Sequence, residues 1–174
     1  LFRSSAASDV YKRQTGDRVV SNGNHAEYVV VNQNLCTRIP DNTDIKEASF
    51  TVLGSIALHG LRLSETSLGS KVVVIGLGII GQLVCRLAEA QGSEVIGIDP
   101  DTKRTDMSTN FYTSVEEANM TNVDSVIITA ATSSNEPIEV ATKIARNKAK
   151  IVVVGDIPLN LSLIHISEPT RLAT

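Results

Sequence analysis

The sequence predicts an α/β protein with a doubly wound parallel sheet, and three observations support this fold class. Short continuous apolar runs, such as KVVVIG (71–76), are typical of strands that are buried on both faces of a parallel sheet. Amphipathic segments of helix length separate these runs, which implies right-handed crossovers between the strands. A glycine-rich turn joins the first long apolar run to the helix that follows it.

Residues 15–65 predict short strands and then a helical segment. Three segments that are rich in β-branched residues are expected to be strands: DRVV (17–20), HAEYVVV (25–31) and LCTRI (35–39). Residues 41–65 have apolar residues at helical spacing, with Asp44 or Thr43 as the cap. We expect Gly54 to interrupt this helix, because glycine is a poor helix former.

Strands and helices alternate through the rest of the chain. Four apolar runs are expected to be parallel strands: 71–76, 93–99, 123–131 and 149–155. Helices are expected over 79–92 and 135–148, where apolar residues recur at helical spacing. The segment 100–122 is polar and irregular, and we expect only a short strand near Phe111 and a short helix over 115–119.

The turn VVVIGLGIIGQL carries the clearest chemistry in the sequence. Gly76, Gly78 and Gly81 form a G-x-G-x-x-G pattern between a predicted strand and a predicted helix. In this pattern the first glycine allows a sharp turn, and the second lets a diphosphate approach the backbone. The third lets the helix pack close to the strand. The pattern and its context predict a Rossmann domain that binds a dinucleotide, with a plain strand-to-helix turn as the alternative.

Asp99 supports the dinucleotide interpretation. It ends the second predicted strand 18 residues after Gly81, which is within the usual distance for the acid that binds the adenosine ribose hydroxyls. Its alternative role is that of a loop or cap residue. A carboxylate repels a 2′-phosphate, so Asp99 favours NAD over NADP. Lys103 and Arg104 lie just beyond it and would weaken that preference near the cofactor, although a solvated loop is the simpler interpretation of both.

The rest of the predicted cofactor site consists of backbone donors and small residues. Three residues would contribute main-chain N–H groups at the start of the helix: Leu77, Ile79 and Ile80. Ala130, Ala131 and Gly155 follow two strands at the carboxyl edge of the sheet, where open α/β sheets bind ligands. Their small size would admit the nicotinamide ribose, and ordinary close packing explains them equally well.

The composition argues against several kinds of partner. The chain has 16 basic and 19 acidic residues, a net charge of −3, and no basic patch of the kind that binds nucleic acid or a membrane surface. No apolar run is long enough to span a bilayer. Cys36 and Cys85 lack neighbouring metal ligands, so we expect reduced, apolar cysteines in a cytoplasmic protein. His25, Glu27 and His59 show no partner by spacing, and no catalytic residue is assigned.

Together these segments resemble the medium-chain dehydrogenase/reductase superfamily, which includes the zinc-type alcohol dehydrogenases. Three stretches carry the resemblance: GDRVV…HAEYVVVNQNLCTRIPD, EASFTVLGSIALHGL and GSKVVVIGLGIIGQL…EVIGIDPDTKR. The resemblance implies a fragment of a GroES-like β domain over 15–45, a linking helical region over 46–69 and a truncated NAD-binding Rossmann domain over 70–160. Segments such as VLGSIALHGLR also resemble a bacterial subgroup that is fused to a second module of the Gfo/Idh/MocA type.

Departures from the family pattern concern zinc. The structural zinc lobe of the family has no room here, because only SNGN (21–24) separates the first two predicted strands. A cysteine that binds the catalytic metal in many members is absent from SFTVLGSIALHG (49–60), and the other catalytic ligands of the family lie upstream of GDRV. The residues present therefore do not support a zinc site.

We expect the two ends of the chain to be artefacts. DVYKRQ (9–14) and LSLIHI (161–166) can be encoded by one DNA segment read on opposite strands, since GATGTGTATAAGAGACAG encodes DVYKRQ and its reverse complement encodes LSLIHI. The longer segments at both ends resemble translated adapter DNA from sequencing libraries. We therefore exclude 1–14 and 161–174 from the fold, and we expect the sheet to end near Val154.

These observations predict a nicotinamide-dependent oxidoreductase that moves a hydride between NAD(H) and a small-molecule alcohol or carbonyl substrate. The present piece would mainly hold the cofactor, would show no turnover alone, and would belong to an intact protein that forms a homo-oligomer. Two alternatives remain open. One is a regulatory Rossmann domain that senses NAD, and the other is a zinc-free quinone or enoyl reductase of the same superfamily, which would favour NADP.

Overall fold

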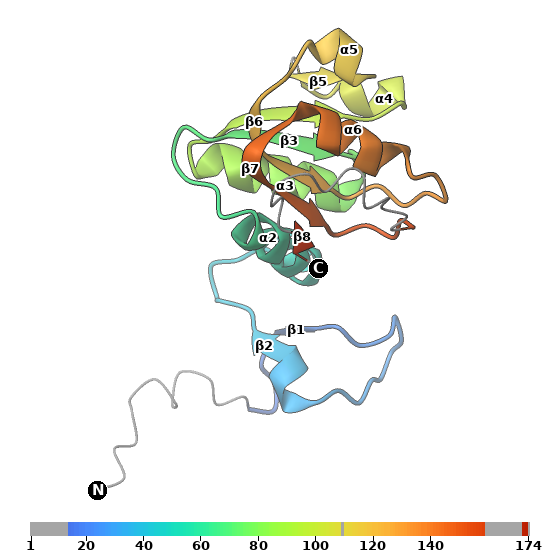
Figure 1. Cartoon of the computed structure of the whole chain (residues 1–174). Helices are drawn as coiled ribbons and strands as arrows, with labels where there is room; N and C mark the ends of the chain where they lie inside the picture. Colours follow the sequence, from blue (N-terminus) through green and yellow to red (C-terminus); the bar gives the residue numbers. More distant parts are fainter. Residues whose placement is uncertain (1–13, 109, 159–171, 174) are drawn as a thin grey trace, which may run out of the picture. The chain divides into compact units, whose positions relative to one another are not determined.

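A computed structural model of the chain describes residues 14–108, 110–158 and 172–173 (Figure 1). The chain divides into two compact units, with the boundary between Val52 and Leu53. The helices and strands follow in chain order: β1 (Val19–Ser21), the 3₁₀ helix η2 (Gln33–Leu35), β2 (Cys36–Arg38), α1 (Ile45–Ala48), α2 (Thr51–Leu63), β3 (Lys71–Ile75), α3 (Ile79–Ala90), β4 (Glu94–Ile98), α4 (Thr102–Thr105), β5 (Phe111–Tyr112), α5 (Val115–Ala118), β6 (Val123–Ile128), α6 (Glu136–Ile144), β7 (Ala145–Val153) and β8 (Leu172–Ala173).

The second unit is built on a parallel sheet with the strand order β5-β4-β3-β6-β7-β8. The chain runs outward from β3 through β4 to β5, and then returns to the other side of β3 to form β6. The strand order therefore reverses between β3 and β6. This is the order of a Rossmann sheet, and it confirms the predicted parallel α/β architecture.

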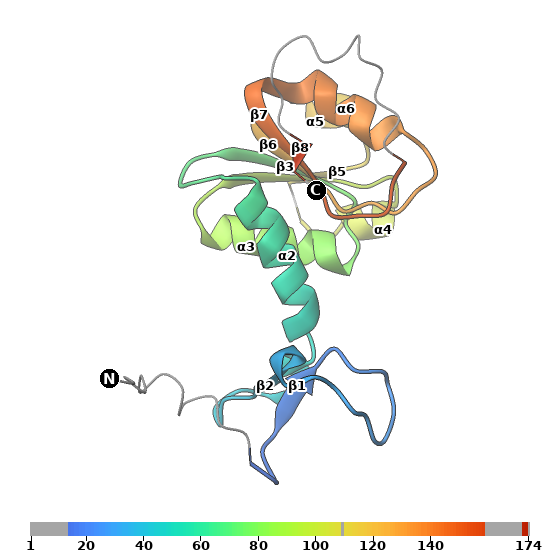
Figure 2. The same ribbon diagram turned by 60° about the horizontal axis from the view of Figure 1, so that its bottom comes forward.

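Helices cover both faces of this sheet (Figure 2). Along β3 the side chains alternate between the faces, so that Val72 and Val74 pack with α2 and α3, whereas Val73 and Ile75 pack with α5 and α6. All four are buried, which explains why β3 appears in the sequence as one unbroken apolar run. Within the described ranges no helix is long and apolar enough to span a membrane.

The first unit contains less regular structure than the sequence predicts. β1 and β2 pair in antiparallel orientation, with Val19 opposite Arg38, close to where DRVV and LCTRI predict strands. The strand predicted over 25–31 is wrong, because residues 25–28 form bends, residues 29–31 have no regular secondary structure, and the side chains of Tyr28 and Val30 are exposed. A strand needs a hydrogen-bonding partner, and in the described part of this unit β1 and β2 pair only with each other.

The helical segment predicted over 41–65 is confirmed, but it breaks at a different residue. Asp44 caps α1, since its Oδ1 accepts from the Lys46 N–H at 2.6 Å. The break falls at Ser49–Phe50 and not at Gly54, which lies inside α2. The Ser49 hydroxyl donates to the Lys46 carbonyl at 2.6 Å, a local bond of the kind that competes with continuation of a helix.

The boundary between α6 and β7 also differs from the prediction. The helix was expected to extend over 135–148, but α6 ends at Ile144 and β7 follows directly. The pairing of β7 with β6 shifts register here, where Lys148 has a φ of 66°. Arg146 Nε lies 2.6 Å from Asp124 Oδ1 on β6, which holds the shifted segment beside its neighbour. No glycine or proline marks this bend in the sequence.

β8 lies beyond the edge that the sequence predicts. We expected the sheet to end near Val154, but Leu172–Ala173 pairs with Ile151–Val152 of β7. An edge strand offers unpaired N–H and C=O groups, to which a short extended segment can bond. The apolar segment LSLIHI, at 161–166, lies outside the described residues.

Replacing Gly54 by alanine should stabilise the chain. A Cβ at this position in α2 meets no atom within 4 Å, so alanine improves helix propensity without a clash. We expect the free energy of unfolding, measured in urea, to rise by about 0.5–1 kcal/mol. The matched control is Gly155→Ala, whose Cβ would overlap the Ala130 carbonyl oxygen, and its free energy of unfolding should fall. No gain in stability for Gly54→Ala would contradict this account of α2.

Candidate functional site

The glycine-rich turn lies at the carboxyl end of β3, directly beside the end of β6. Gly76 has a φ of 96°, a conformation that residues with a side chain rarely adopt, and a Cβ there would lie 2.6 Å from the Ala130 nitrogen. A Cβ at Gly81 would overlap the Gly76 carbonyl oxygen and lie 2.7 Å from Thr129 Oγ1. The first and third glycines therefore let α3 and the end of β6 pack against the turn.

Gly78 has a different environment. It precedes α3 as the N-cap residue, and a Cβ at this position would meet no atom within 4 Å. The N–H groups of Gly78, Ile79 and Ile80 have no hydrogen-bond acceptor within the described part of the chain, as expected at the start of a helix. Open space beside unpaired N–H groups is a place where an anion can bind.

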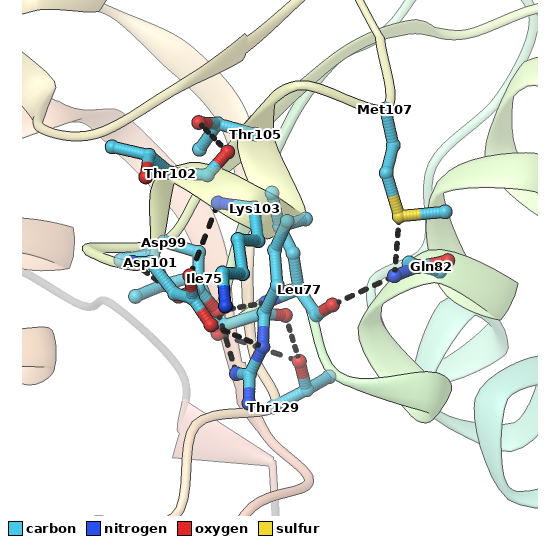
Figure 3. A network of polar contacts seen from close by, with 12 residues as sticks. Ile75, Leu77, Gln82, Asp99, Asp101, Thr102, Lys103, Thr105, Met107 and Thr129 are labelled. Atoms are coloured by element: carbon cyan, nitrogen blue, oxygen red, sulfur yellow. Dashed lines mark hydrogen bonds and ion pairs between the residues drawn. The ribbon is translucent and has the colours of Figure 1, made fainter.

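Side chains from three elements hold the turn in place (Figure 3). The Leu77 N–H donates to Asp99 Oδ2 at 2.7 Å, and the Leu77 carbonyl accepts from Gln82 Nε2 at 3.0 Å. The Gly76 carbonyl accepts from Thr129 Oγ1 at 2.6 Å. The Leu77 side chain is fully buried in the core. Packing and hydrogen bonds therefore both fix the conformation of the turn.

Asp99, the predicted ribose ligand, is only 3% exposed. Besides the Leu77 N–H, its carboxylate accepts from the Asp101 N–H at 2.9 Å and from Arg104 Nη1 at 3.1 Å. Burial raises the pKa of the Asp99 carboxyl, but the hydrogen bonds from Leu77, Asp101 and Arg104 outweigh burial and hold this pKa below its ordinary value. The carboxylate is therefore ionised at neutral pH.

Arg104 lies in a helix and contacts Asp99, contrary to the prediction of a solvated loop. Lys103 and Arg104 were expected in a solvated loop, but both lie in α4, a short helix that Asp101 caps by accepting from the Lys103 N–H at 3.0 Å. The half-exposed guanidinium of Arg104 forms an ion pair of 3.1 Å with Asp99 and lies 3.5 Å from Asp101. The sequence signal for this cap is an aspartate two residues before Lys103.

A cavity of about 660 Å³ opens beside the turn. Its lining includes five of the predicted site residues: Gly76, Gly78, Asp99, Ala130 and Ala131. The sequence interpretation missed several other lining residues, among them Thr113, Ser114, Val115, Pro137 and Val140. Their signal is positional, because Thr113 directly follows β5 and so lies at the same carboxyl edge of the sheet as the glycine turn.

The other predicted site residues lie outside this lining. Leu77 and Gly81 are buried behind the turn, and Ile79 and Ile80 begin α3. Gly155 packs against the end of β6, which supports the close-packing interpretation of this glycine. A second cavity of about 470 Å³ is lined by residues 131–133 and 156–158, so Ala131 lines both cavities.

None of the candidate catalytic residues lines the first cavity. His25 and Glu27 belong to the first unit, and His59 is exposed on α2. Among residues 14–108 and 110–158, no cluster of three or more His, Cys, Asp or Glu side chains could hold a metal ion. Cys85 lies in the core, where burial and the nearby Glu89 carboxylate raise the pKa of its thiol to about 12.

The chain is similar to known dehydrogenases. Residues 50–155 match the family model described as D-isomer specific 2-hydroxyacid dehydrogenase, NAD binding domain. D-guloside 3-dehydrogenase of Escherichia coli K12 is 36% identical over 105 residues, which cover 58% of this chain and 30% of the relative. D-xylulose reductase A of Aspergillus oryzae is 32% identical over 90 residues, which cover 51% of this chain and 25% of the relative. The matched part thus spans about a quarter to a third of these relatives.

Solved structures share the fold. CAD from Helicobacter pylori, complexed with NADP(H), matches with a TM-score of 0.69 at 23% identity, covering 82% of this chain and 43% of that one. At this identity the likeness concerns the fold alone. The solved neighbours are zinc-type medium-chain alcohol dehydrogenases, in agreement with the resemblance in the sequence, whereas the matching family model describes a different group of Rossmann dehydrogenases.

The three comparisons agree on one domain. The family model and the similar relatives are dehydrogenases or reductases, most of the solved neighbours are named as such, and the part that they share with this chain contains the NAD-binding domain. The predicted NAD-binding domain of a dehydrogenase is therefore confirmed. The chain belongs to the family whose model it matches, the NAD-binding domain of the D-isomer specific 2-hydroxyacid dehydrogenases.

Proposed function

We propose that the cavity beside the glycine turn binds NAD(H) and that this part of the protein holds the cofactor for hydride transfer. The observation that carries the proposal is the hydrogen bond between Leu77 and Asp99, which joins the turn to a buried carboxylate at one cavity. The N–H groups of Gly78, Ile79 and Ile80 would hold the diphosphate, and Asp99 would accept from the adenosine ribose hydroxyls.

The cavity lining suits the two ends of a dinucleotide. On the side of α5 and α6, Val115, Pro137 and Val140 offer apolar surface against which an adenine ring would pack. On the side of β6, Ala130 and Ala131 are small enough to leave room for the nicotinamide ribose. The glycine turn lines the same cavity through Gly76 and Gly78, and there it would hold the diphosphate of such a molecule.

NAD is the cofactor that we propose, because the ionised Asp99 carboxylate would repel a 2′-phosphate. One observation favours NADP as a second candidate. The Arg104 guanidinium lies 3.1 Å from Asp99, so it would offset the repulsion and offer a charged donor to a phosphate. Three solved neighbours carry NADP, NADP(H) or NADPH, which adds weight to this second candidate.

For the whole protein we propose a medium-chain dehydrogenase that oxidises a secondary alcohol or reduces the matching ketone. The similar enzymes are named for D-xylulose and D-guloside, so a sugar or polyol is the proposed substrate class. The family model describes only the NAD-binding domain, residues 50–155, whereas the likeness to a putative zinc-binding dehydrogenase of 26% identity covers 77% of this chain. This wider likeness supports the medium-chain type for the whole protein. Turnover of the intact protein with polyols and with D-2-hydroxyacids distinguishes the two.

The surroundings of this domain are proposed from the resemblance in the sequence. The division into a GroES-like fragment (15–45), a linking region (46–69) and a Rossmann domain (70–160) follows the medium-chain pattern. A fused Gfo/Idh/MocA-like module, a homo-oligomeric state and a cytoplasmic location belong to the same proposal. Sequencing the gene on both sides of residues 15–160 tests the domain order directly.

Replacing Gly78 by valine should abolish dinucleotide binding and leave the fold intact. In the free chain a Cβ at this position meets no atom within 4 Å, but the valine side chain would fill the space that the diphosphate needs. Calorimetric titration with NAD should detect no binding, while the thermal midpoint of the free variant should match that of the original chain. Normal affinity for NAD would refute the role of the glycine turn.

Replacing Asp99 by alanine should weaken NAD binding and narrow the difference between NAD and NADP. The variant loses charged acceptors for the ribose hydroxyls, so the Kd for NAD should rise about tenfold or more, while the Kd for NADP should change less. Asp106→Ala removes an exposed carboxylate nearby and serves as the control. An unchanged ratio of the two Kd values would contradict the ribose role of Asp99.

Protonation of Asp99 should not change the affinity for NAD between about pH 8 and about pH 5. The pKa of the Asp99 carboxyl lies below its usual value near 4, so the carboxylate stays ionised over this range. The same depressed pKa stabilises the fold above that usual value, and this contribution is lost as the pH falls through the pKa of the folded state. Calorimetric titrations at several pH values check the first statement. The prediction would be contradicted if the original chain lost affinity steeply over this pH range while Asp99→Ala did not.

A further inference from the structure

We propose that Thr129 and Gln82 are positioning residues of the diphosphate site, which orient two successive peptide groups of the glycine turn before the cofactor arrives. Neither residue belongs to the G-x-G-x-x-G pattern. Thr129 lines the cavity beside the turn, whereas Gln82 is not among its lining residues. The inference rests on the proposed binding of a dinucleotide. It goes beyond that proposal by naming the side chains that fix the orientation of the peptide groups in the turn.

The first peptide group joins Gly76 and Leu77. Its carbonyl accepts from Thr129 Oγ1 at 2.6 Å, and its N–H donates to Asp99 Oδ2 at 2.7 Å. In a trans peptide the N–H and C=O point in opposite directions, so these partners hold the plane from both sides. The Thr129 N–H donates to the Ile75 carbonyl at 2.8 Å and continues the pairing of β3 with β6. The sheet therefore fixes the place of the threonine hydroxyl.

The second peptide group joins Leu77 and Gly78. Its carbonyl accepts from Gln82 Nε2 at 3.0 Å, so its N–H, which belongs to Gly78, points the opposite way. The Gln82 backbone N–H also donates to the Gly78 carbonyl at 3.0 Å, as the first bond of α3. The same carboxamide lies 3.2 Å from the Met107 sulfur, a second contact that limits its rotation. One residue thus holds both of the carbonyl groups that flank the Gly78 N–H.

These bonds matter because a rotated peptide would reverse the charge that meets the diphosphate. If the plane between Leu77 and Gly78 turned over, a carbonyl oxygen would face the anion in place of an N–H. The rotation would also remove the donor of the Leu77 carbonyl. A turn that is already oriented avoids the free-energy cost of ordering when the ligand binds. Thr129 and Gln82 would therefore raise affinity by holding the turn in its binding orientation, and Gln82 would do so from outside the lining of the cavity.

Three variants of the full chain test the inference by calorimetric titration with NAD. Thr129→Val and Gln82→Met keep the size of the side chain and remove the donor, whereas Thr129→Ser keeps the hydroxyl. We expect the Kd for NAD to rise about threefold to tenfold in each of the first two variants and to stay near its original value in Thr129→Ser. The ¹⁵N–¹H signal of Gly78 in the free chain should shift in Gln82→Met, because the orientation of its N–H changes.

Thermal midpoints of the free variants separate positioning from general destabilisation. If Thr129→Val lowers the thermal midpoint strongly, the Kd for NAD of Gln82→Met is the decisive measurement. Gln82 is partly exposed, so its substitution leaves the core untouched. Unchanged Kd values in Thr129→Val and Gln82→Met, while Gly78→Val abolishes binding, would overturn this inference alone. An original chain that binds no dinucleotide would overturn the proposed function and this inference with it.

Discussion

The architecture of the second unit depends on how closely the backbone of the glycine turn approaches the end of β6. A Cβ at Gly76 would reach the Ala130 nitrogen, and one at Gly155 would overlap the Ala130 carbonyl oxygen. A Cβ at Gly81 would overlap the turn itself. These glycines come from the ends of β3 and β7 and from α3, and they meet where the strand order reverses. Main-chain contact, and not side-chain packing, therefore sets the width of the crevice.

A hydrogen bond from the Leu77 N–H also holds the buried carboxylate of Asp99 next to a turn that is suited to bind an anion. Asp99 tolerates burial because donors from Leu77, Asp101 and Arg104 surround its carboxylate. By accepting from Leu77, it also turns the preceding carbonyl of Gly76 away from the cavity. The carboxylate thus contributes to the shape of the turn as well as to the charge beside it, and Arg104 moderates that charge from the solvent side.

The parts of the fold that could be predicted from sequence are those with a local mark. Buried parallel strands leave unbroken apolar runs, and the glycine spacing marks the turn that precedes α3. The strand expected over 25–31 failed because strand formation requires a partner that composition does not reveal. The contact of Arg104 with Asp99 could not be predicted, since it depends on the direction in which α4 leaves β4. Thr113 reaches the cavity only through the order of the strands, which no local pattern specifies.

The crevice is assembled from segments that are far apart along the chain. The hydroxyl of Thr129 donates to a carbonyl 53 residues earlier. β3 and β6 are neighbours in the sheet, but β4 and β5 lie between them in the sequence. Strands that are far apart in the sequence lose chain entropy when they come together, before their contacts offset this loss. The pairing of β3 with β6 therefore forms slowly. The turn therefore acquires its final shape late in folding, after its own residues and the following helix are already present. A dinucleotide that binds there would recognise only completed domains and would shift the equilibrium toward them by mass action.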